Sequence, residues 1–358
     1  MMKRVDNVRE KLEELDLDAL LVTNMYNVRY LANFTGTTGL VVITKEEAYF
    51  ITDFRYTEQA AAQAQGFEII KNEGLIYEEV AKIVKKDNIQ NLGFEDTNIT
   101  YATFTKINEI IDCELKPVTG LVEKLREVKT EDEIEIIQEA VNIAEKGFDY
   151  ILGFVKPGIT EIEVANELDF YMRKLGATEV SFDTIVASGI RSAMPHGVAS
   201  DKIIENGDMV TIDFGCYYKG YVSDMTRTFA VGDPGEQLKE IYEIVYQANK
   251  KVAEVAKAGM TGAELDAVAR DYITEHGYGE SFGHTTGHGI GLEIHEGPAI
   301  SFRNEEALVE NNVITNEPGI YIPGLGGVRI EDDLVITKDG NYNLMSSPKE
   351  LTIIEPNI

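Results

Sequence analysis

Apolar positions in the first third of the chain alternate between helical and strand spacing. A helical pattern near residues 5–15 is followed by short apolar runs, with further helical patterns between several of them. The strand-length runs cover residues 19–22, 39–44, 48–51, 67–70 and 91–94. This alternation predicts an α/β domain, which we place at residues 1–122 because the pattern changes around 117–120. Its polar stretch with Asp53, Arg55 and Tyr56 is interpreted as a helix start with surface residues.

The remaining residues, 123–358, show the same helix punctuation twice. Capping boxes, in which a threonine and a glutamate three residues later satisfy each other's free amides, begin at Thr130, Thr160 and Thr261. The approach to Thr160, Lys-Pro-Gly-Ile, is echoed before Thr261 by Lys-Ala-Gly-Met. Each copy continues into a histidine segment and then a strand, and the strands 210–215 and 314–319 align without a gap. We therefore predict an α/β (α+β) fold with an internal duplication around a pseudo-twofold axis.

Composition and charge narrow the classes of partner. Hydrophobic residues make up 44% and charged residues 27% of the 358 residues, which is ordinary for a globular protein. The formal net charge of −29 argues against a nucleic-acid or anionic-membrane partner, since phosphate binding requires a basic surface. Two cysteines without metal-type spacing suit a reducing cytoplasm. The charged N-terminus predicts no signal peptide, and no apolar run approaches the roughly 20 residues that span a bilayer.

The segment 283–296 concentrates candidate chemistry, because it holds three of the 5 histidines: His284, His288 and His295. Histidines four residues apart could share a helix face, but the glycines at 287, 289 and 291 make a helix improbable. We expect an irregular loop that enters a strand. The glycines would let the backbone come near a bound group.

Four carboxylates lie in two hairpin patterns, one in each half. If Tyr218 pairs with Tyr221, Asp213 faces residue 226, and Asp224 lies on the same face of the hairpin. In the second half, Glu317 and Glu331 are symmetric about Gly324. A site between two related halves would receive equivalent side chains from each. For any single acid, an exposed salt-bridge partner remains the simpler interpretation; for all four in matched hairpins it does not.

Four converging carboxylates without counter-charge would be strongly unfavourable, and some would stay protonated. Two divalent cations remove that problem. Oxygen-rich ligation with one imidazole suits manganese, cobalt or iron better than a thiolate-type zinc site, and such a pair can activate water and polarise a carbonyl. His288, between two glycines, is the natural imidazole ligand.

The other histidines have less defined roles. We expect His284, His295 and His196 to face the substrate or support the ligands, and spacing alone does not assign them. For each, a satisfied core histidine is the alternative. His276, before Gly277, is interpreted as a helix-end charge. Arg329 shares a strand face with Glu331 and would steady the ligands, a salt bridge at the rim being the alternative.

With these motifs, the whole chain closely resembles the pita-bread metallopeptidases, in the branch of aminopeptidase P and proline dipeptidase (prolidase). The similar strings are Thr211–Gly215, Gly287–Gly289, His295–Glu296, Glu317–Gly319 and Arg329–Asp332. The resemblance implies a smaller N-terminal domain followed by a duplicated catalytic domain. It also implies two divalent metals, usually Mn²⁺, with Co²⁺, Fe²⁺ or Zn²⁺ as alternatives. The implied ligands are Asp213, Asp224, His288, Glu317 and Glu331.

The same resemblance implies residue roles and an assembly. Glu317 would also act as acid and base for the attacking water. His196 and His295 would contact the substrate, and His284 would lie beside the metals. Members are typically homodimers, in which Asp53, Arg55 and Tyr56 would lie at a neighbour's cleft.

The implied activity is the removal of an N-terminal residue that precedes proline, from small peptides. Many proline dipeptidases carry an arginine four residues after the histidine of the His-Glu pair, where this chain has Ala299. Alanine cannot bind a substrate carboxylate, so we expect an Xaa-Pro aminopeptidase, with an Xaa-Pro dipeptidase (prolidase) as the alternative. A methionine aminopeptidase usually lacks such an N-terminal domain. A silent peptide-binding protein or a metal-free creatinase-type hydrolase is disfavoured because all five ligands are present.

Overall fold

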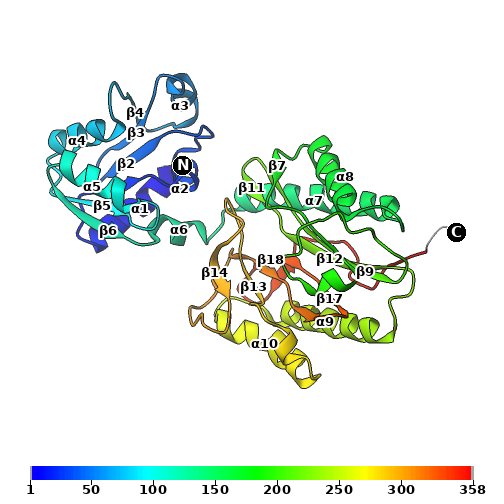
Figure 1. Cartoon of the computed structure of the whole chain (residues 1–358). Coiled ribbons are helices and arrows are strands. Elements are labelled where there is room, and N and C mark those ends of the chain that lie inside the picture. Colours follow the sequence, from blue (N-terminus) through cyan, green and yellow to red (C-terminus); the bar gives the residue numbers. More distant parts are fainter. Residues whose placement is uncertain (1, 356–358) are drawn as a thin grey trace. The chain divides into compact units, whose positions relative to one another are not determined.

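The computed structural model describes residues 2–355, which form two compact units divided between Arg126 and Glu127 (Figure 1). No described helix has both the length and the apolar character needed to cross a membrane. We describe each unit by itself.

The N-terminal unit is a mixed six-stranded sheet flanked by helices, in the order β4-β3-β2-β1-β5-β6. Its elements are α1 (Met2–Glu14), β1 (Ala19–Val22), α2 (Met25–Ala32), β2 (Leu40–Thr44), β3 (Ala48–Thr52), α3 (Thr57–Gln63), β4 (Glu68–Lys71), α4 (Ile76–Lys86), β5 (Asn91–Glu95), α5 (Tyr101–Ile110), β6 (Glu114–Val118) and α6 (Leu121–Arg126). Strands β1 and β2 pair antiparallel, and β1 and β5 pair parallel. The α/β class expected for this domain is confirmed.

The apolar pattern of the sequence did not predict the edge strand β6, because most of its residues are not buried. Only Val118 of its five residues is buried, so the strand has no apolar run. Pro117 cannot donate a ladder hydrogen bond and is therefore tolerated at an edge. Residues 53–56 precede α3, with Tyr56 directly before its first residue and Arg55 paired with Asp53.

The C-terminal unit places strands between two pairs of helices, α7 with α8 and α9 with α10 (Figure 1). Its first elements are α7 (Glu131–Phe154), α8 (Glu161–Lys174), β7 (Glu179–Val180), β8 (Ile185–Ser188), a 3₁₀ turn (Gly189–Ala193), β9 (Asp208–Phe214), β10 (Cys216–Tyr218), β11 (Tyr221–Val222), β12 (Met225–Val231), α9 (Glu236–Val255) and α10 (Gly262–Glu275). After a second 3₁₀ turn (Gly279–Ser281) come β13 (Gly287–Gly289), β14 (Glu296–Ile300), β15 (Val313–Asn316), β16 (Gly319–Ile322), β17 (Gly326–Arg329), β18 (Asp332–Ile336), β19 (Asn341–Asn343) and β20 (Ile353–Ile354).

The predicted duplication is present in the backbone of this unit. All three predicted capping boxes form, at the starts of α7, α8 and α10. Thr160 bridges Ile203 in the first half, and Thr261 bridges Ala307 in the second. The carboxylate-bearing strands also match, because β9 pairs antiparallel with β12 as β15 does with β18. The two halves are therefore related by pseudo-twofold symmetry.

Candidate metal centre

The first carboxylate pair sits on the β9–β12 hairpin as the register predicted. Tyr218 pairs with Tyr221, and Asp213 pairs with Thr226. Asp224 precedes β12 by one residue and is only 4% exposed. The amide of Asp224 donates to Asp333 Oδ2 at 3.2 Å, which fixes the backbone beneath its carboxylate.

The second pair flanks the β16–β17 hairpin. Gly319 pairs with Arg329, and Gly324 lies in the turn with a φ of +81°, which favours glycine. Glu317 and Glu331 lie two residues outside this pair, at equal distance from Gly324. Glu331 is 1% exposed, and its Oε2 accepts a 2.6 Å hydrogen bond from the hydroxyl of Thr226.

The two hairpins and the histidine segment converge on one point. Ligand atoms of Asp224, His288 and Glu331 all lie within 4.8 Å of one another. His288 Nε2 is 3.6 Å from Asp224 Oδ2 and 3.4 Å from Glu317 Oε1. Asp213 belongs to the same group, because its charge acts on the pKa of Asp224, Glu317 and Glu331.

Burial and mutual repulsion make this cluster electrostatically unfavourable by itself. Burial, followed by the charges of neighbouring carboxylates, raises the pKa of Asp224 and the pKa of Glu331 well above their ordinary values. Burial also raises the pKa of Glu317 to about 8, although the Arg329 charge opposes it. One oxygen of Asp213, Oδ1, is buried and has no hydrogen-bond partner in the part of the chain that the structure describes. A bound cation would offset the repulsion and complete the partners of these oxygens.

The His288 ring is held in a state suited to ligation. Its Nδ1 lies 3.0 Å from the carbonyl of Gly289, which can only accept, so Nδ1 carries the proton. Burial lowers the pKa of His288 to about 4, which keeps the ring neutral near pH 7 and leaves the Nε2 lone pair directed at the carboxylates. The backbone amide of His288 also donates to Thr315 Oγ1 at 3.1 Å.

Close strand packing requires the glycines beside His288. A Cβ on Gly287 would lie 2.1 Å from the Thr315 carbonyl, and one on Gly289 would lie 2.1 Å from the Gly297 carbonyl. A larger residue at either position would therefore displace a neighbouring strand. The segment itself is irregular around the short strand β13, as predicted.

A buried hydrogen-bond chain links Asp213 to His284 through Arg329 and Tyr321. Arg329 Nη2 donates to Asp213 Oδ2 at 2.7 Å, and its Nη1 donates to the Tyr321 hydroxyl at 2.8 Å. His284 Nδ1 must donate to the Thr285 carbonyl, at 2.7 Å, because a carbonyl only accepts. Burial lowers the pKa of His284 to about 4, so the ring is neutral near pH 7. Its Nε2 therefore accepts a hydrogen bond from the Tyr321 hydroxyl at 2.8 Å. Arg329 is thus buried and bonded to Asp213, and is not a rim residue.

Three residues of this centre were absent from the sequence predictions: Tyr321, Thr226 and Thr315. Thr315 Oγ1 donates to Glu317 Oε1 at 3.2 Å, and Thr226 accepts from Arg329 Nε at 3.1 Å while donating to Glu331. Strand periodicity carries part of the missing signal, since Thr315 and Tyr321 are separated from Glu317 by two and four positions. Thr226, in contrast, bonds to Glu331 and Arg329 in the other half, and the partners of Tyr321, Arg329 and His284, are brought together by packing.

The remaining histidines separate into two groups. The His288 and His295 ring centroids are 4.4 Å apart, and the charge of His196 acts on the pKa of both His284 and His295. Within residues 2–355, neither the His196 ring nor the His295 ring has a hydrogen-bond partner, so both are available to another molecule. His276 caps the end of α10, where its Nδ1 lies 2.8 Å from the Tyr272 carbonyl.

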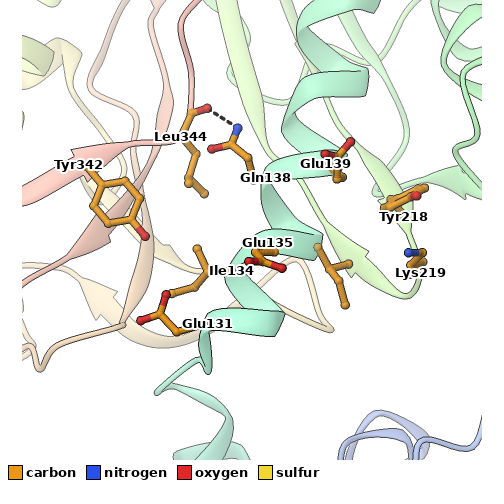
Figure 2. A pocket seen from close by; sticks show the side chains of 10 residues that line it. Glu131, Ile134, Glu135, Gln138, Glu139, Tyr218, Lys219, Tyr342 and Leu344 are labelled. Atoms are coloured by element: carbon orange, nitrogen blue, oxygen red, sulfur yellow. Dashed lines mark hydrogen bonds between the residues drawn. The ribbon is translucent and has the colours of Figure 1, made fainter.

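An open groove of about 430 Å³ lies elsewhere on the C-terminal unit (Figure 2). It runs along α7 between the β10–β11 turn, with Lys219, and β19, with Tyr342. Gln138 closes one side by donating to the Leu344 carbonyl at 2.8 Å. None of the residues expected in the metal centre lines this groove.

Comparisons with known proteins agree with this architecture. Residues 135–338 match the sequence model of metallopeptidase family M24, and residues 4–128 match that of the creatinase/prolidase N-terminal domain. The Xaa-Pro dipeptidase of Pyrococcus furiosus is 42% identical, over 98% of this chain and 100% of its own. The solved structure of an Xaa-Pro dipeptidase from Bacillus anthracis is 58% identical and superposes with a TM-score of 0.97, over 98% of this chain and 99% of its own. That of an X-Pro aminopeptidase from Thermotoga maritima is 42% identical with a TM-score of 0.90, over 96% and 100%.

Proposed function

The chain belongs to metallopeptidase family M24, and on that premise we propose that it is a dinuclear metal-dependent Xaa-Pro dipeptidase. The observation that carries the proposal is the convergence of Asp224, His288 and Glu331 within 4.8 Å, beside Glu317 and Asp213. Relatives at 42% and 58% identity named Xaa-Pro dipeptidase support the choice of substrate.

The residues present fit a pair of divalent cations. Asp213, Asp224, His288, Glu317 and Glu331 would hold them, and the all-oxygen set with one imidazole favours Mn²⁺. The cations would polarise the scissile carbonyl and lower the pKa of a water molecule. Bound cations would account for the buried Asp213 Oδ1, which has no partner within residues 2–355, and would offset the repulsion that raises the pKa values of the neighbouring carboxyls.

The protein groups would move the protons and hold the peptide. Glu317 takes a proton from the attacking water and delivers it to the proline nitrogen as the C–N bond breaks. His196 and His295, whose rings have no partner among residues 2–355, contact the peptide at the scissile bond. His284 has both ring nitrogens occupied, so it orients Tyr321 and does not bind substrate. Arg329 keeps Asp213 in place.

A second candidate is the Xaa-Pro aminopeptidase expected from Ala299. The exposed Ala299 of β14 offers no cation to a dipeptide carboxylate, and one 42% identical relative is named X-Pro aminopeptidase. The relatives named above nevertheless favour the dipeptidase, which was the alternative from the sequence.

Product analysis separates the two candidates. Metal-stripped protein is supplied with Mn²⁺ and given Gly-Pro and Gly-Pro-Ala, and the products are identified by mass spectrometry. The dipeptidase proposal predicts a higher kcat/KM for Gly-Pro and loss of activity on chelation. A higher value for Gly-Pro-Ala would support the aminopeptidase, and inactivity on both peptides with metal bound would refute the proposed function.

We further propose a cytoplasmic homodimer. The free cysteines Cys113 and Cys216 suit a reducing compartment. In the dimer, the stretch of Asp53, Arg55 and Tyr56, of which Arg55 is the exposed member, would lie at the neighbour's active site. Light scattering tests the assembly, and a monomeric mass at working concentration would refute it.

A further inference from the structure

The loop that carries His196 is fastened at both ends to one buried carboxylate. Glu161, the first residue of α8, is 0% exposed. Its Oε1 accepts from the amide and the hydroxyl of Ser188, both at 2.8 Å. Its Oε2 accepts from the amide of Ser200 at 3.1 Å and from the Ser200 hydroxyl at 2.6 Å. Ser188 ends β8 and Ser200 follows the loop, so Glu161 closes the loop 189–199.

An arginine inside the loop joins the same carboxylate. Arg191 Nη1 donates to Glu161 Oε2, and Arg191 Nη2 donates to the Val198 carbonyl at 2.9 Å. The guanidinium therefore spans the two sides of the loop around His196. Ser192 Oγ accepts from the Gly327 amide at 2.8 Å, which connects the loop to β17, the strand that ends with Arg329.

Apolar burial contributes little to holding this loop. Ile190, Met194 and Val198 are 63%, 55% and 47% exposed. The His196 ring is exposed and has no hydrogen-bond partner among the described residues, so no contact of its own fixes it. The place of the imidazole thus depends on the polar anchors of the backbone, and Glu161 accepts five of these hydrogen bonds.

The second half of the duplication separates this role from a requirement of the fold. The Gly158 amide donates to the Ile204 carbonyl at 2.9 Å, and the Gly259 amide donates to the Leu308 carbonyl at 2.8 Å in the same way. The residue that corresponds to Glu161 after the second capping box is Gly262. The same junction between helix and strand thus forms without a carboxylate. We therefore attribute the role of Glu161 to the loop and not to this junction.

We propose that Glu161 is a positioning residue that fixes the 189–199 loop and so places His196 against the bound peptide. The proposal rests on the function proposed above, in which His196 contacts substrate. Arg191 shares the role because it links the carboxylate to the far side of the loop. A displacement of about 1 Å in a substrate-contacting group can cost on the order of 100-fold in rate.

The variant E161Q tests the proposal, with E163Q as the matched control. Glutamine keeps the size but cannot accept all five donors, because its Nε2 is itself a donor. Glu163, on the same helix, closes only the capping box with Thr160, so its loss perturbs α8 and leaves the loop bonds intact. We expect E161Q to lower kcat/KM for Gly-Pro by about 10- to 100-fold, at unchanged metal content, and E163Q to change it less than about threefold.

Two further measurements distinguish positioning from general damage. Hydrogen exchange of the 189–199 amides should accelerate in E161Q and not in E163Q. In an H196A background, E161Q should lower kcat/KM further by less than about twofold, because coupled residues are non-additive. Unchanged exchange in the loop, or a full additive loss in the double variant, would overturn the proposal. If E161Q does not fold, R191K replaces it, since lysine cannot bridge Glu161 and Val198 together.

The exchange measurement needs no substrate. A wild-type protein inactive on all Xaa-Pro peptides would therefore refute the proposed function, while exchange in E161Q would still decide whether Glu161 fixes the loop.

Discussion

Arg329 and Asp213 come from opposite halves of the duplicated unit and are joined by a 2.7 Å hydrogen bond from Nη2 to Oδ2. Arg329 is 3% exposed, and its other terminal nitrogen holds the Tyr321 hydroxyl. The pair therefore joins the two halves beside the carboxylate cluster. It leaves Asp213 Oδ1 as a buried oxygen without a hydrogen-bond partner among the described residues, which a cation would supply.

The Tyr321 hydroxyl is the link whose loss is easiest to measure. In Tyr321→Phe, Arg329 Nη1 loses its acceptor and His284 Nε2 loses its donor. Loss of about 1–2 kcal/mol of hydrogen bonding predicts a fall in kcat of about tenfold, with a smaller change in KM. The matched control is Tyr342→Phe, at an exposed tyrosine of β19. Equal kcat values for both variants would show that the hydrogen-bond chain from Asp213 to His284 has no influence on turnover.

Glu317 carries the proton transfer in the proposed reaction. Glu317→Gln keeps the shape but removes the base, so we expect kcat to fall by on the order of 100- to 10,000-fold. Glu310→Gln, at an exposed glutamate, serves as control. A silent binding protein would instead retain peptide affinity in both variants, which calorimetry with Gly-Pro detects.

Metal binding should stabilise the fold through His288. A ligand at 100 times its Kd stabilises the folded state by about 2.7 kcal/mol, so Mn²⁺ should raise the melting temperature of the stripped protein and chelation should reverse the rise. His288→Ala should lose most of this shift. His276→Ala, at the end of α10, should keep it. A shift of equal size in both variants would place the metal elsewhere.

The departure at Ala299 gives a test of substrate length. Ala299→Arg would place a cation on the exposed side of β14, next to the His295 segment. A charged hydrogen bond to a dipeptide carboxylate is worth about 1.5–3 kcal/mol, so the Gly-Pro to Gly-Pro-Ala ratio of kcat/KM should rise about tenfold. Ala299→Met controls for side-chain volume. No change in the ratio would indicate that another group already binds the carboxylate.

The lowered pKa of Asp18, a residue outside the metal centre, predicts that the stability of the fold depends on pH. Burial raises its pKa, but hydrogen bonds from the Asn91 and Gln90 amides, together with Lys45, outweigh this and leave the pKa lowered. Because the pKa is lowered, the contribution of Asp18 to folding stability is complete at pH values above its unfolded-state pKa. It is lost as the pH falls through its folded-state pKa.

Asp18→Asn should therefore cost about 1 kcal/mol in unfolding free energy at about pH 7, and less below about pH 4. Urea denaturation followed by circular dichroism measures the difference, with Asp16→Asn at an exposed position as control. A destabilisation of Asp18→Asn that stays constant with pH would contradict the assignment.

The sequence predicted those parts of the site that depend on short-range geometry. The turn at Gly324 set Glu317 opposite Glu331, and the Tyr218–Tyr221 turn set Asp213 opposite Thr226, because hairpin register follows from the turn. Tyr321 was not predicted as a site residue, because its partners, Arg329 and His284, come together only in the folded chain.

Other features were hidden for related reasons. Strand β6 lies at a sheet edge, where a strand needs no apolar run. Glycine is required at 287 because of the Thr315 carbonyl, which is distant in the sequence. It is required at 289 because of the Gly297 carbonyl, which a loop separates from it. The anchoring of the His196 loop by Glu161 likewise depends on tertiary contacts that no local pattern encodes.

The location of the metal ions tests the central claim most directly. Crystals grown with Mn²⁺ would be measured on both sides of the manganese absorption edge. We predict two anomalous peaks about 3.5–4 Å apart, enclosed by Asp213, Asp224, His288, Glu317 and Glu331. A fully loaded, active protein with no manganese peak among these five side chains would contradict the account.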